Sequence, residues 1–583
     1  MDANARRRLL AAATLVLVLG GTRAPAAAPP ACPGGDAGLK LPAGFCATVF
    51  ADNLGYARHL TVAPNGVVYV NTWSGRYYGN RPPHAGGFLV ALQDTTGGGR
   101  ANVIDRFGPS AAQGGVGGTG ILLYKGALYV ETKDKIVKYT IPQGSIVPTA
   151  APEVVVSGLP LGGDHPMHPF TIDADGMLYV DVASATNSCQ EKNRIARSPG
   201  IKPCTELETR GGIWRYDANK TNQAFSAKDR YATGIRNGEG IAADAGGHAI
   251  YATQHGRDQL HQNFPDLYKP GEEATLPAEE LVLLRQGGDY GWPFCYFDDH
   301  QNKLVLAPEY GGDGGKTQGL CAQKIAPVAA FPAHWAPDGL LIYTGTSFPE
   351  RYHNGAFIAF HGSWDRAPYP QGGYNVVFQP LGTGGAGKCE VFADGFAGAQ
   401  RDPGHAEHRP VGVAQGPDGS LYVSDDKAGR VYRISYKGGE APNSPVTPCY
   451  GEGDAAGMAT ATTAVPPEGV HPNAGATAQM PVPKGATPAL VALGGQVFHG
   501  QTGGAACTGC HGTDGSGTPL GPSLTDKTYN WSDGSWAGIQ KVIQDGVPQP
   551  KNYRGPMPPM GGAQLSPEQV KALAAYVWGL SHH

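Results

Sequence analysis

The chain has 583 residues, more than one compact core usually supports. Glycine (87) and proline (49) are abundant, charged residues make up 16% and aromatic residues 9%, which favours a turn-rich folded protein over a disordered one. The formal net charge of −4 excludes nucleic-acid binding driven by bulk positive charge.

The N-terminus has the pattern of an export signal. The basic segment Arg6 to Arg8 precedes an apolar run from Leu9 to Gly20, which is shorter than the roughly 20 residues of a membrane-spanning helix. Ala26-Ala27-Ala28 then offers a cleavage site. We therefore expect residues 1–28 to be a signal peptide and the mature protein to be periplasmic or secreted, without stable insertion in a membrane. A retained anchor helix is the alternative.

The ten cysteines suit an oxidising compartment. Two of them belong to a motif described below, and the other eight allow four disulfides whose connectivity remains open. Pairing between sequence neighbours closes the shortest loops. It predicts the bonds Cys32–Cys46, Cys189–Cys204, Cys295–Cys321 and Cys389–Cys449.

One pattern recurs six times before residue 437: a turn containing glycine, followed by a short apolar run with a tyrosine. The tyrosines are Tyr69, Tyr129, Tyr179, Tyr251, Tyr343 and Tyr422. β-Branched and aromatic residues fill these runs, and helical periodicity is almost absent. The pattern predicts a six-bladed β-propeller over residues 29–437, because such units bury their faces by stacking on one another. A long β-sandwich is the alternative, but it would show more regular turn signals.

The composition changes after the last repeat. Residues 438–485 are rich in Pro, Gly, Ala and Thr, which predicts a linker, held in part if Cys449 pairs with Cys389. A helical period follows over residues 486–583. Thr487 and Pro488 favour a helix to about Phe498. A second helix begins at a capping box and has one apolar face, made of Val570, Leu573, Ala574, Val577 and Leu580.

This predicted all-α domain contains Cys507-Thr508-Gly509-Cys510-His511, the attachment signature of haem c. The two thiols, Cys507 and Cys510, would add to the haem vinyl groups, and the His511 imidazole would reach the iron from one face. Met557, in a proline-flanked loop, is the candidate for the other axial position, and Met560 is its rival. A redox thiol pair or half a zinc site would not explain the adjacent histidine and the downstream methionine.

The helical region resembles class I cytochromes c over Thr487–Leu580, which implies one-electron transfer. With both axial positions filled, the haem does not itself oxidise an organic substrate. We therefore expect a second redox centre elsewhere in the chain.

Polar segments in the predicted propeller point to that centre. They are Asp164-His165, Arg236-Asn237, Gln254–Asp258, Tyr290-Gly291-Trp292-Pro293, His361–Arg366 and His408-Arg409-Pro410. In this order they resemble PQQ-dependent sugar dehydrogenases of the soluble glucose dehydrogenase type, particularly the sorbosone dehydrogenase branch, over roughly Leu39–Ile434. The resemblance implies a six-bladed propeller with PQQ and calcium at one mouth.

The resemblance also implies catalytic roles. His165 matches the base that takes the proton of the substrate C1 hydroxyl while hydride passes to the PQQ C5 carbonyl. His168, three residues on, is its rival. Asp164 would position the substrate or orient the histidine. Arg236 matches the arginine that polarises the accepting carbonyl.

Further residues match binding positions of these enzymes. The implied cofactor contacts are Asn237, His255, Arg366 and Arg409. The backbone carbonyls of Gly256 and Arg257 would hold the PQQ calcium, and Glu280 with Tyr290 would form a second calcium site. The glucose enzymes have another arginine two residues after Arg409, where this chain has Val411, so glucose itself is not the expected substrate.

Together these features predict an exported quinohaemoprotein oxidoreductase. A sugar, or a related hydroxyl or aldehyde substrate of the sorbosone kind, would reduce PQQ, and electrons would pass to haem c. The external acceptor would be a cytochrome, a copper protein or a quinone-linked respiratory chain. Two alternatives stay open: a ligand-binding propeller without PQQ, and a calcium-dependent propeller hydrolase or lactonase. Eight-bladed quinoprotein alcohol dehydrogenases typically carry adjacent cysteines, which this chain lacks.

Overall fold

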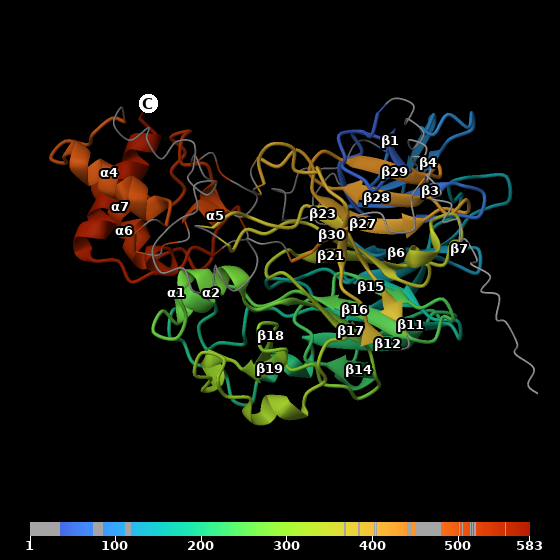
Figure 1. Cartoon of the computed structure of the whole chain (residues 1–583), viewed down its shortest axis with the longest axis horizontal. Helices are drawn as coiled ribbons and strands as arrows, with labels where there is room; N and C mark the ends of the chain where they lie inside the picture. The colour runs from blue at the N-terminus through green and yellow to red at the C-terminus, as the bar shows by residue number, and fades with distance from the viewer. Residues whose placement is uncertain are drawn as a thin grey trace, which may run out of the picture.

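The computed structural model of the chain describes residues 35–582, apart from two sets of gaps. The longer gaps are 74–85, 111–117, 440–445 and 451–479, and the shorter ones are 367–368, 383–384, 402, 404, 501, 504, 506, 513–514, 516, 518–520 and 554–555. The expected signal peptide, Cys32 and most of the expected linker lie outside the described residues. Figure 1 shows a β-sheet body beside a helical domain drawn in red.

The β-sheet body is a six-bladed propeller, as the repeats predict. Its first blade consists of β2 (Tyr56–Val62), β3 (Val68–Trp73), β4 (Leu89–Gln93) and β5 (Val103–Phe107). The second consists of β6 (Ile121–Tyr124), β7 (Ala127–Thr132), β8 (Lys135–Thr140) and β9 (Glu153–Ser157), with β13 (Gln223–Ala224) added in parallel. The third consists of β10 (Phe170–Ile172), β11 (Met177–Val182), β12 (Gly212–Asp217) and β14 (Arg230–Thr233).

The later blades follow the same antiparallel order. The fourth consists of β15 (Ile241–Ala243), β16 (Ile250–Gln254), β17 (Glu279–Leu283) and β20 (Ala329–Phe331). The fifth consists of β21 (Pro337–Ile342), β22 (Ala356–Phe360), β23 (Asn375–Gln379), β26 (Glu390–Ala393) and β30 (Thr447–Pro448). The sixth consists of β27 (Pro410–Gln415), β28 (Leu421–Asp425), β29 (Arg430–Tyr436) and β1 (Phe45–Ala51).

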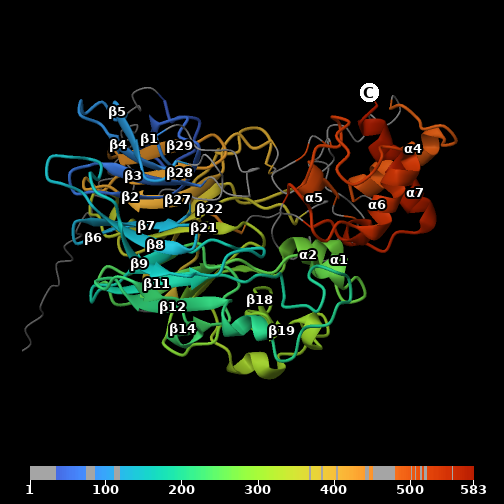
Figure 2. The same cartoon turned by 180° about the vertical axis from the view of Figure 1, so that it is seen from behind.

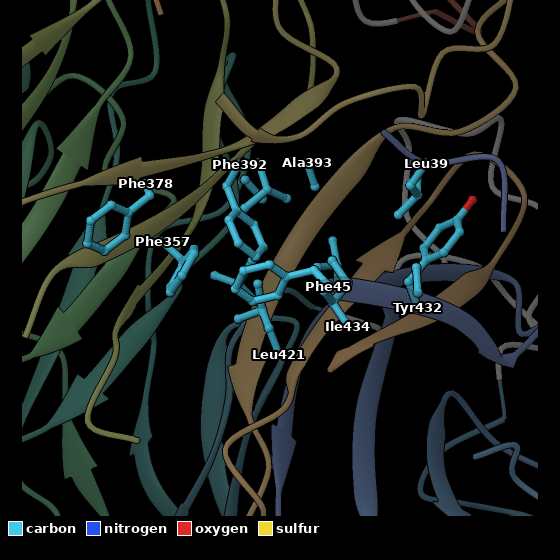
Figure 3. Packing of buried hydrophobic residues seen from close by; sticks show 14 of the residues in the cluster. Leu39, Phe45, Phe357, Phe378, Phe392, Ala393, Leu421, Tyr432 and Ile434 are labelled. Carbon is cyan, nitrogen blue, oxygen red and sulfur yellow. The ribbon is translucent and has the colours of Figure 1, made fainter. Parts of the chain in front are cut away.

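The ring closes by pairing the first strand with the last blade. β1 runs antiparallel to β29, with Phe45 opposite Tyr436. The Phe45 ring packs edge-on against two other rings. Its centroid lies 4.8 Å from that of Phe348 and 5.0 Å from that of Phe392. Figure 3 shows this aromatic cluster between the fifth and sixth blades. Burying the cluster holds the two ends of the propeller together.

The tyrosine repeat marks the second strand in five blades. The exception is Tyr343, which directly follows β21, the first strand of the fifth blade. The second strand there is β22, where Phe357 and Phe360 are fully buried in the inter-blade core. Phenylalanine therefore replaces tyrosine at this position, and the sequence pattern identified the neighbouring strand instead.

The disulfide predictions agree with the structure wherever it describes both cysteines. The bonds Cys189–Cys204, Cys295–Cys321 and Cys389–Cys449 are present. Cys46 is also disulfide-bonded. The bond from Cys449, together with the pairing of β30 with β26, holds the start of the expected linker on the fifth blade.

Small elements interrupt the blades. They include the hairpins β18–β19 (Cys295–Asp298, Lys303–Leu306) and β24–β25 (Leu381–Gly382, Gly385–Ala386), and the helices α1 (Leu260–Asn263) and α2 (Pro270–Thr275). Short 3-10 helices are η2 (Thr205–Glu208), η3 (Ala227–Asp229), η4 (Pro308–Tyr310), η5 (Gly319–Gln323) and η6 (Glu350–Tyr352). Helices α1 and α2 lie on the side of the propeller that faces the helical domain in both views (Figures 1 and 2).

The helical domain consists of α4 (Pro488–Phe498), α5 (Cys507–His511), α6 (Trp536–Asp545), η9 (Pro559–Gly562) and α7 (Pro567–Leu580). Thr487 caps α4, and Ser566 with Gln569 forms the predicted capping box of α7. Phe498 and Tyr576 pack between these two helices. Within the described parts of the chain, no helix combines the length and apolar character that crossing a bilayer requires.

Candidate active site

One cavity of about 310 Å³ is lined by both the propeller and the helical domain. Its propeller wall comes from loops that enter a first strand or leave a second strand. In an antiparallel blade these two kinds of loop open at the same mouth. The cavity therefore joins that mouth of the propeller to the segment around α5.

His165 lies on the propeller wall, in the loop before β10. Its Nδ1 is 2.9 Å from the carbonyl oxygen of Ser184, so Nδ1 carries the proton and donates it. Nε2 is then an unprotonated acceptor. Burial, reinforced by the positive charge of Arg236, lowers the pKa of His165 well below its ordinary value. The imidazole is therefore uncharged at neutral pH.

The rival histidine has a different environment. His168 is completely buried and does not line the cavity. Its Nδ1 lies 3.2 Å from Glu131, and its Nε2 lies 3.0 Å from the carbonyl of Pro160. Both ring nitrogens are thus engaged, and the geometry favours His165.

Arg236 is held by four hydrogen bonds in a fixed orientation. Its guanidinium donates to the Asn187 backbone and side chain at 3.1 and 2.9 Å, to the Gly256 carbonyl at 3.0 Å and to Asp258 at 2.8 Å. The residue is only 3% exposed. A guanidinium fixed in this way loses little freedom when a polar group binds beside it.

Arg194 extends this arrangement into a chain of alternating charges. It donates to Asp164 at 3.0 Å and to Asp258 at 2.8 Å. Burial alone would raise the pKa of Asp258, but Arg236 and Arg194 together lower it. Asp164 thus pairs with Arg194, and Ser184 is the residue that orients the His165 ring.

The expected cofactor contacts Asn237, His255 and Arg409 also line the cavity. The Oδ1 atom of Asn237 is buried without a hydrogen-bond partner among the described residues. Burial disfavours a charged His255, yet the interaction with Asp338 at 3.3 Å, assisted by Glu279, raises its pKa. The Asn237 oxygen would accept from a donor group of the cofactor, and the Arg409 guanidinium would pair with a carboxylate, so these two residues fit a polar, anionic cofactor such as PQQ.

Arg409 is fixed by the backbone of the fifth blade. It donates to the carbonyls of His361 and Gly362, both at 3.0 Å. Arg366, by contrast, is not among the residues that line the cavity, and donates to the carbonyl of Pro370 at 3.1 Å. The structure therefore brings Arg409, but not Arg366, to the expected cofactor position.

The expected calcium ligands are only partly assembled. The Gly256 carbonyl is at the cavity and accepts from Arg236, while the Arg257 side chain points to Glu309. Glu280 accepts from Gln254 through one oxygen, and its other oxygen is buried without a partner in the described chain. Burial raises the pKa of Glu280 to about 8.

Tyr290 does not join Glu280 in a common cavity. Its hydroxyl donates to the carbonyl of Leu283 at 2.7 Å and accepts from the amide of Arg285 at 2.9 Å. The side chain is completely buried. These contacts hold Tyr290 as a packing residue of the fourth blade.

The helical wall carries the haem-attachment residues. Cys507, Cys510, His511 and Met557 all line the cavity. The Nδ1 atom of His511 is 2.9 Å from the carbonyl of Pro522, which leaves Nε2 as the acceptor nitrogen. A histidine that ligates a metal is typically oriented by such a bond.

The two methionines differ in position. Met557 exchanges backbone hydrogen bonds with Val547 at 2.7 and 3.0 Å, which fixes it at the cavity. Met560 is absent from the cavity lining and has a left-handed backbone, with φ of 57°. The two thiols, an acceptor imidazole and a thioether around one space fit haem c.

Sequence reasoning gave no role to several residues that line this cavity. Asp258, His361 and Trp364 lie in the polar segments that it named, whereas Arg194 and His334 lie outside those segments. The Arg194 guanidinium lies 5.9 Å from the centre of the Trp364 ring. These residues come from separate loops. No sequence motif distinguishes them from other polar loop residues, and only the fold shows that they line one cavity.

Models of two protein families match separate parts of the chain, one in the propeller and one in the helical domain. The model of the TrAA12-like family matches residues 117–437, and that of the cytochrome c oxidase, cbb3-type, subunit III family matches residues 500–577. A pyrroloquinoline quinone-dependent sugar dehydrogenase of Hypocrea jecorina is 22% identical over 325 residues, covering 53% of this chain and 71% of that protein.

Other relatives cover smaller parts. The cbb3-type cytochrome c oxidase subunit FixP of Rhizobium etli is 38% identical over 79 residues, 13% of this chain and 27% of that subunit. An uncharacterized protein of Borreliella burgdorferi is 28% identical over 208 residues, 35% of this chain; the chain spans about half (48%) of that relative's length.

Solved structures show the same propeller. The holo PQQ domain of pyranose dehydrogenase from Coprinopsis cinerea superposes with a TM-score of 0.54 at 19% identity, covering 70% of this chain and 99% of that domain. The calcium structure of the Trichoderma reesei family AA12 enzyme gives a TM-score of 0.54 at 19% identity, covering 68% and 97%. With more than half of its residues matched, the chain belongs to the TrAA12-like family and joins a PQQ-dependent sugar dehydrogenase-like propeller to a C-terminal cbb3-type cytochrome c domain.

Proposed function

We propose that this protein oxidises a sugar, or a related hydroxyl or aldehyde substrate of the sorbosone kind, with PQQ and passes the electrons to its own haem c. The supporting observation is the shared cavity. His165 and Arg236 line one wall, and Cys510 and His511 line the other. Two redox centres on one cavity need no diffusing carrier between them.

When bound, PQQ supplies a two-electron acceptor and haem c a one-electron acceptor. His165 takes a proton from the substrate at Nε2, because Nδ1 is occupied by its bond to Ser184. Arg236 directs its guanidinium toward the negative charge that develops during the reaction, and Asp258 keeps it in that orientation. Asp164 and Arg194 form the polar edge of the substrate space.

The remaining residues hold the cofactors. Asn237, His255 and Arg409 bind PQQ, and the backbone of Gly256 and Arg257 binds its calcium. Cys507 and Cys510 would attach the haem, and His511 and Met557 would supply ligands to its iron.

The protein acts after export, in the periplasm or outside the cell. Its three described disulfides suit an oxidising compartment. The external electron acceptor would be a cytochrome, a copper protein or a quinone-linked respiratory chain. Fusion of the two domains makes the first transfer intramolecular.

The test is haem reduction in the full-length, haem-loaded protein supplied with PQQ and Ca²⁺. A panel of aldoses, sorbosone and simple alcohols is added under anaerobic conditions, and haem absorbance is followed. We expect substrate-dependent reduction that requires PQQ and is lost in His165→Asn. The matched control is His353→Asn, whose ring nitrogen bonds only a backbone carbonyl outside the cavity. Lactone hydrolysis without haem reduction would support the hydrolase alternative and refute this function.

A further inference from the structure

Three buried side chains converge beside the cavity from three different loops. Asp258 follows β16, His334 lies between β20 and β21, and Asp365 follows β22. One ligand atom from each lies within 4.8 Å of the others. The three residues are 9%, 6% and 1% exposed.

The orientation of His334 is fixed by the backbone. Its Nε2 lies 2.8 Å from the carbonyl oxygen of Glu273 and 3.1 Å from that of Leu276. Both partners are acceptors, so Nε2 carries the proton and Nδ1 presents a lone pair. Histidines that ligate metals are typically held in this way.

The free nitrogen of His334 faces a carboxylate. Its Nδ1 lies 3.9 Å from Oδ2 of Asp365, which is too long for a hydrogen bond. Two ligands of one ion at bond lengths near 2.1 Å are separated by about 3.0–4.2 Å. The spacing therefore suits a shared cation better than a direct contact.

Asp365 supplies an independent indication. Its Oδ2 accepts from the amide of Gln259 at 2.7 Å, whereas its Oδ1 is buried and has no partner in the described chain. An unpaired buried carboxylate oxygen carries a substantial desolvation penalty. A cation at this position would remove the penalty.

Asp258 is already oriented from the opposite side. Its Oδ2 accepts from Arg194 and Arg236, both at 2.8 Å. Its second oxygen is the one available to an ion. The two guanidinium groups would then act as outer partners that fix the ligating carboxylate.

We propose that Asp258, His334 and Asp365 bind a divalent transition-metal ion of the zinc class. An imidazole with two carboxylates suits such an ion, whereas calcium prefers a full set of oxygen ligands. The site differs from the expected PQQ calcium site, whose ligands are backbone carbonyls. It ties loops of the fourth and fifth blades together and anchors the carboxylate that holds Arg236. This inference stands independently of the proposed function.

Zn²⁺ is the probe for this site. Full-length, haem-loaded protein is stripped with EDTA and dialysed against buffered low free Zn²⁺, and bound metal is measured by mass spectrometry. Haem attachment occupies both Cys507 and Cys510, so the thiols cannot bind the ion. We expect about one Zn²⁺ per chain, with at least tenfold weaker binding in Asp365→Asn and His334→Gln.

The matched control is His353→Gln. Its ring also bonds a backbone carbonyl, that of Phe348 at 2.9 Å, but it lies outside the cluster. Unchanged Zn²⁺ binding in Asp365→Asn and His334→Gln, no Zn²⁺ binding at all, or a preference for Ca²⁺ would overturn the proposal.

A second measurement needs no variant. Anomalous diffraction at the zinc edge, from crystals of the unmodified protein, should place the ion among the three side chains. An ion found only elsewhere would also overturn the proposal.

Discussion

Replacing Arg194 with methionine should destabilise the propeller, because it removes the partner that the buried Asp258 shares with the partly buried Asp164. Arg194 bridges Asp164 and Asp258, and the three side chains are 9%, 17% and 12% exposed. Removing one member of a buried ion pair costs about 3–5 kcal/mol, since the other charge stays buried. Asp258 keeps Arg236 as its second partner, so the loss should lie toward the lower end of this range.

The expected change in melting temperature follows from the size of the propeller. Its sheets extend from Phe45 to Tyr436. Roughly 390 residues at about 2.1 cal/mol/K each give an unfolding entropy of about 0.8 kcal/mol/K. A loss of about 3–5 kcal/mol then lowers Tm by about 4–6 °C.

Calorimetry of the full-length protein would measure this shift, with haem absorbance reporting the helical domain separately. The control is Arg401→Met, whose ion pair with Asp394 is 45% and 24% exposed. An exposed pair contributes about 1 kcal/mol or less, so Tm should fall by about 1 °C at most. Equal shifts in the two variants would refute the argument that burial makes the Arg194 bridge important.

Three other predictions concern the base, the haem ligand and a disulfide. Burial, with a nearby arginine, holds the pKa of His165 well below 6.5, so the base is already neutral at pH 6.5 and the rate should fall only at lower pH. A pH profile of kcat/KM whose acidic midpoint lies at or above 6.5 would contradict this. Met557→Ala should lower the haem reduction potential in potentiometry, whereas Met560→Ala should leave it nearly unchanged; the reverse result would assign the ligand to Met560. Replacing Cys295 and Cys321 with alanine opens a loop with a sequence separation of 26 and should cost about 3.5 kcal/mol by loop-closure entropy, measured as a fall in Tm; an unchanged Tm would contradict the estimate.

Local sequence patterns predicted the blades but not the closure of the ring. The turn-and-strand repeat depends on neighbouring residues, and it identified the second strand wherever a tyrosine occupies it. The pairing of β1 with β29 joins Thr48 to Arg433 across 385 residues. A short-range sequence pattern does not predict such a contact, because the contact depends on the number of blades and on how they curve around the ring.

In the site, too, residues of local motifs could be predicted from the sequence, whereas contacts between distant segments could not. The residues of continuous motifs, such as His165 and Cys507 to His511, were identified because their chemistry is encoded in adjacent positions. The bridge from Asp164 through Arg194 to Asp258 joins three separate loops. Loops without a functional role also carry such charged residues. The sequence therefore does not show which of these residues pair, because the pairing depends on how the blades place the loops in space.

The most direct test of the account is a stopped-flow measurement of haem reduction in the full-length protein loaded with PQQ, Ca²⁺ and haem. After mixing with an excess of an active sugar, the account predicts a first-order rate that does not change with protein concentration, because both centres lie on one cavity. A rate proportional to protein concentration would show transfer between molecules and contradict the shared-cavity arrangement.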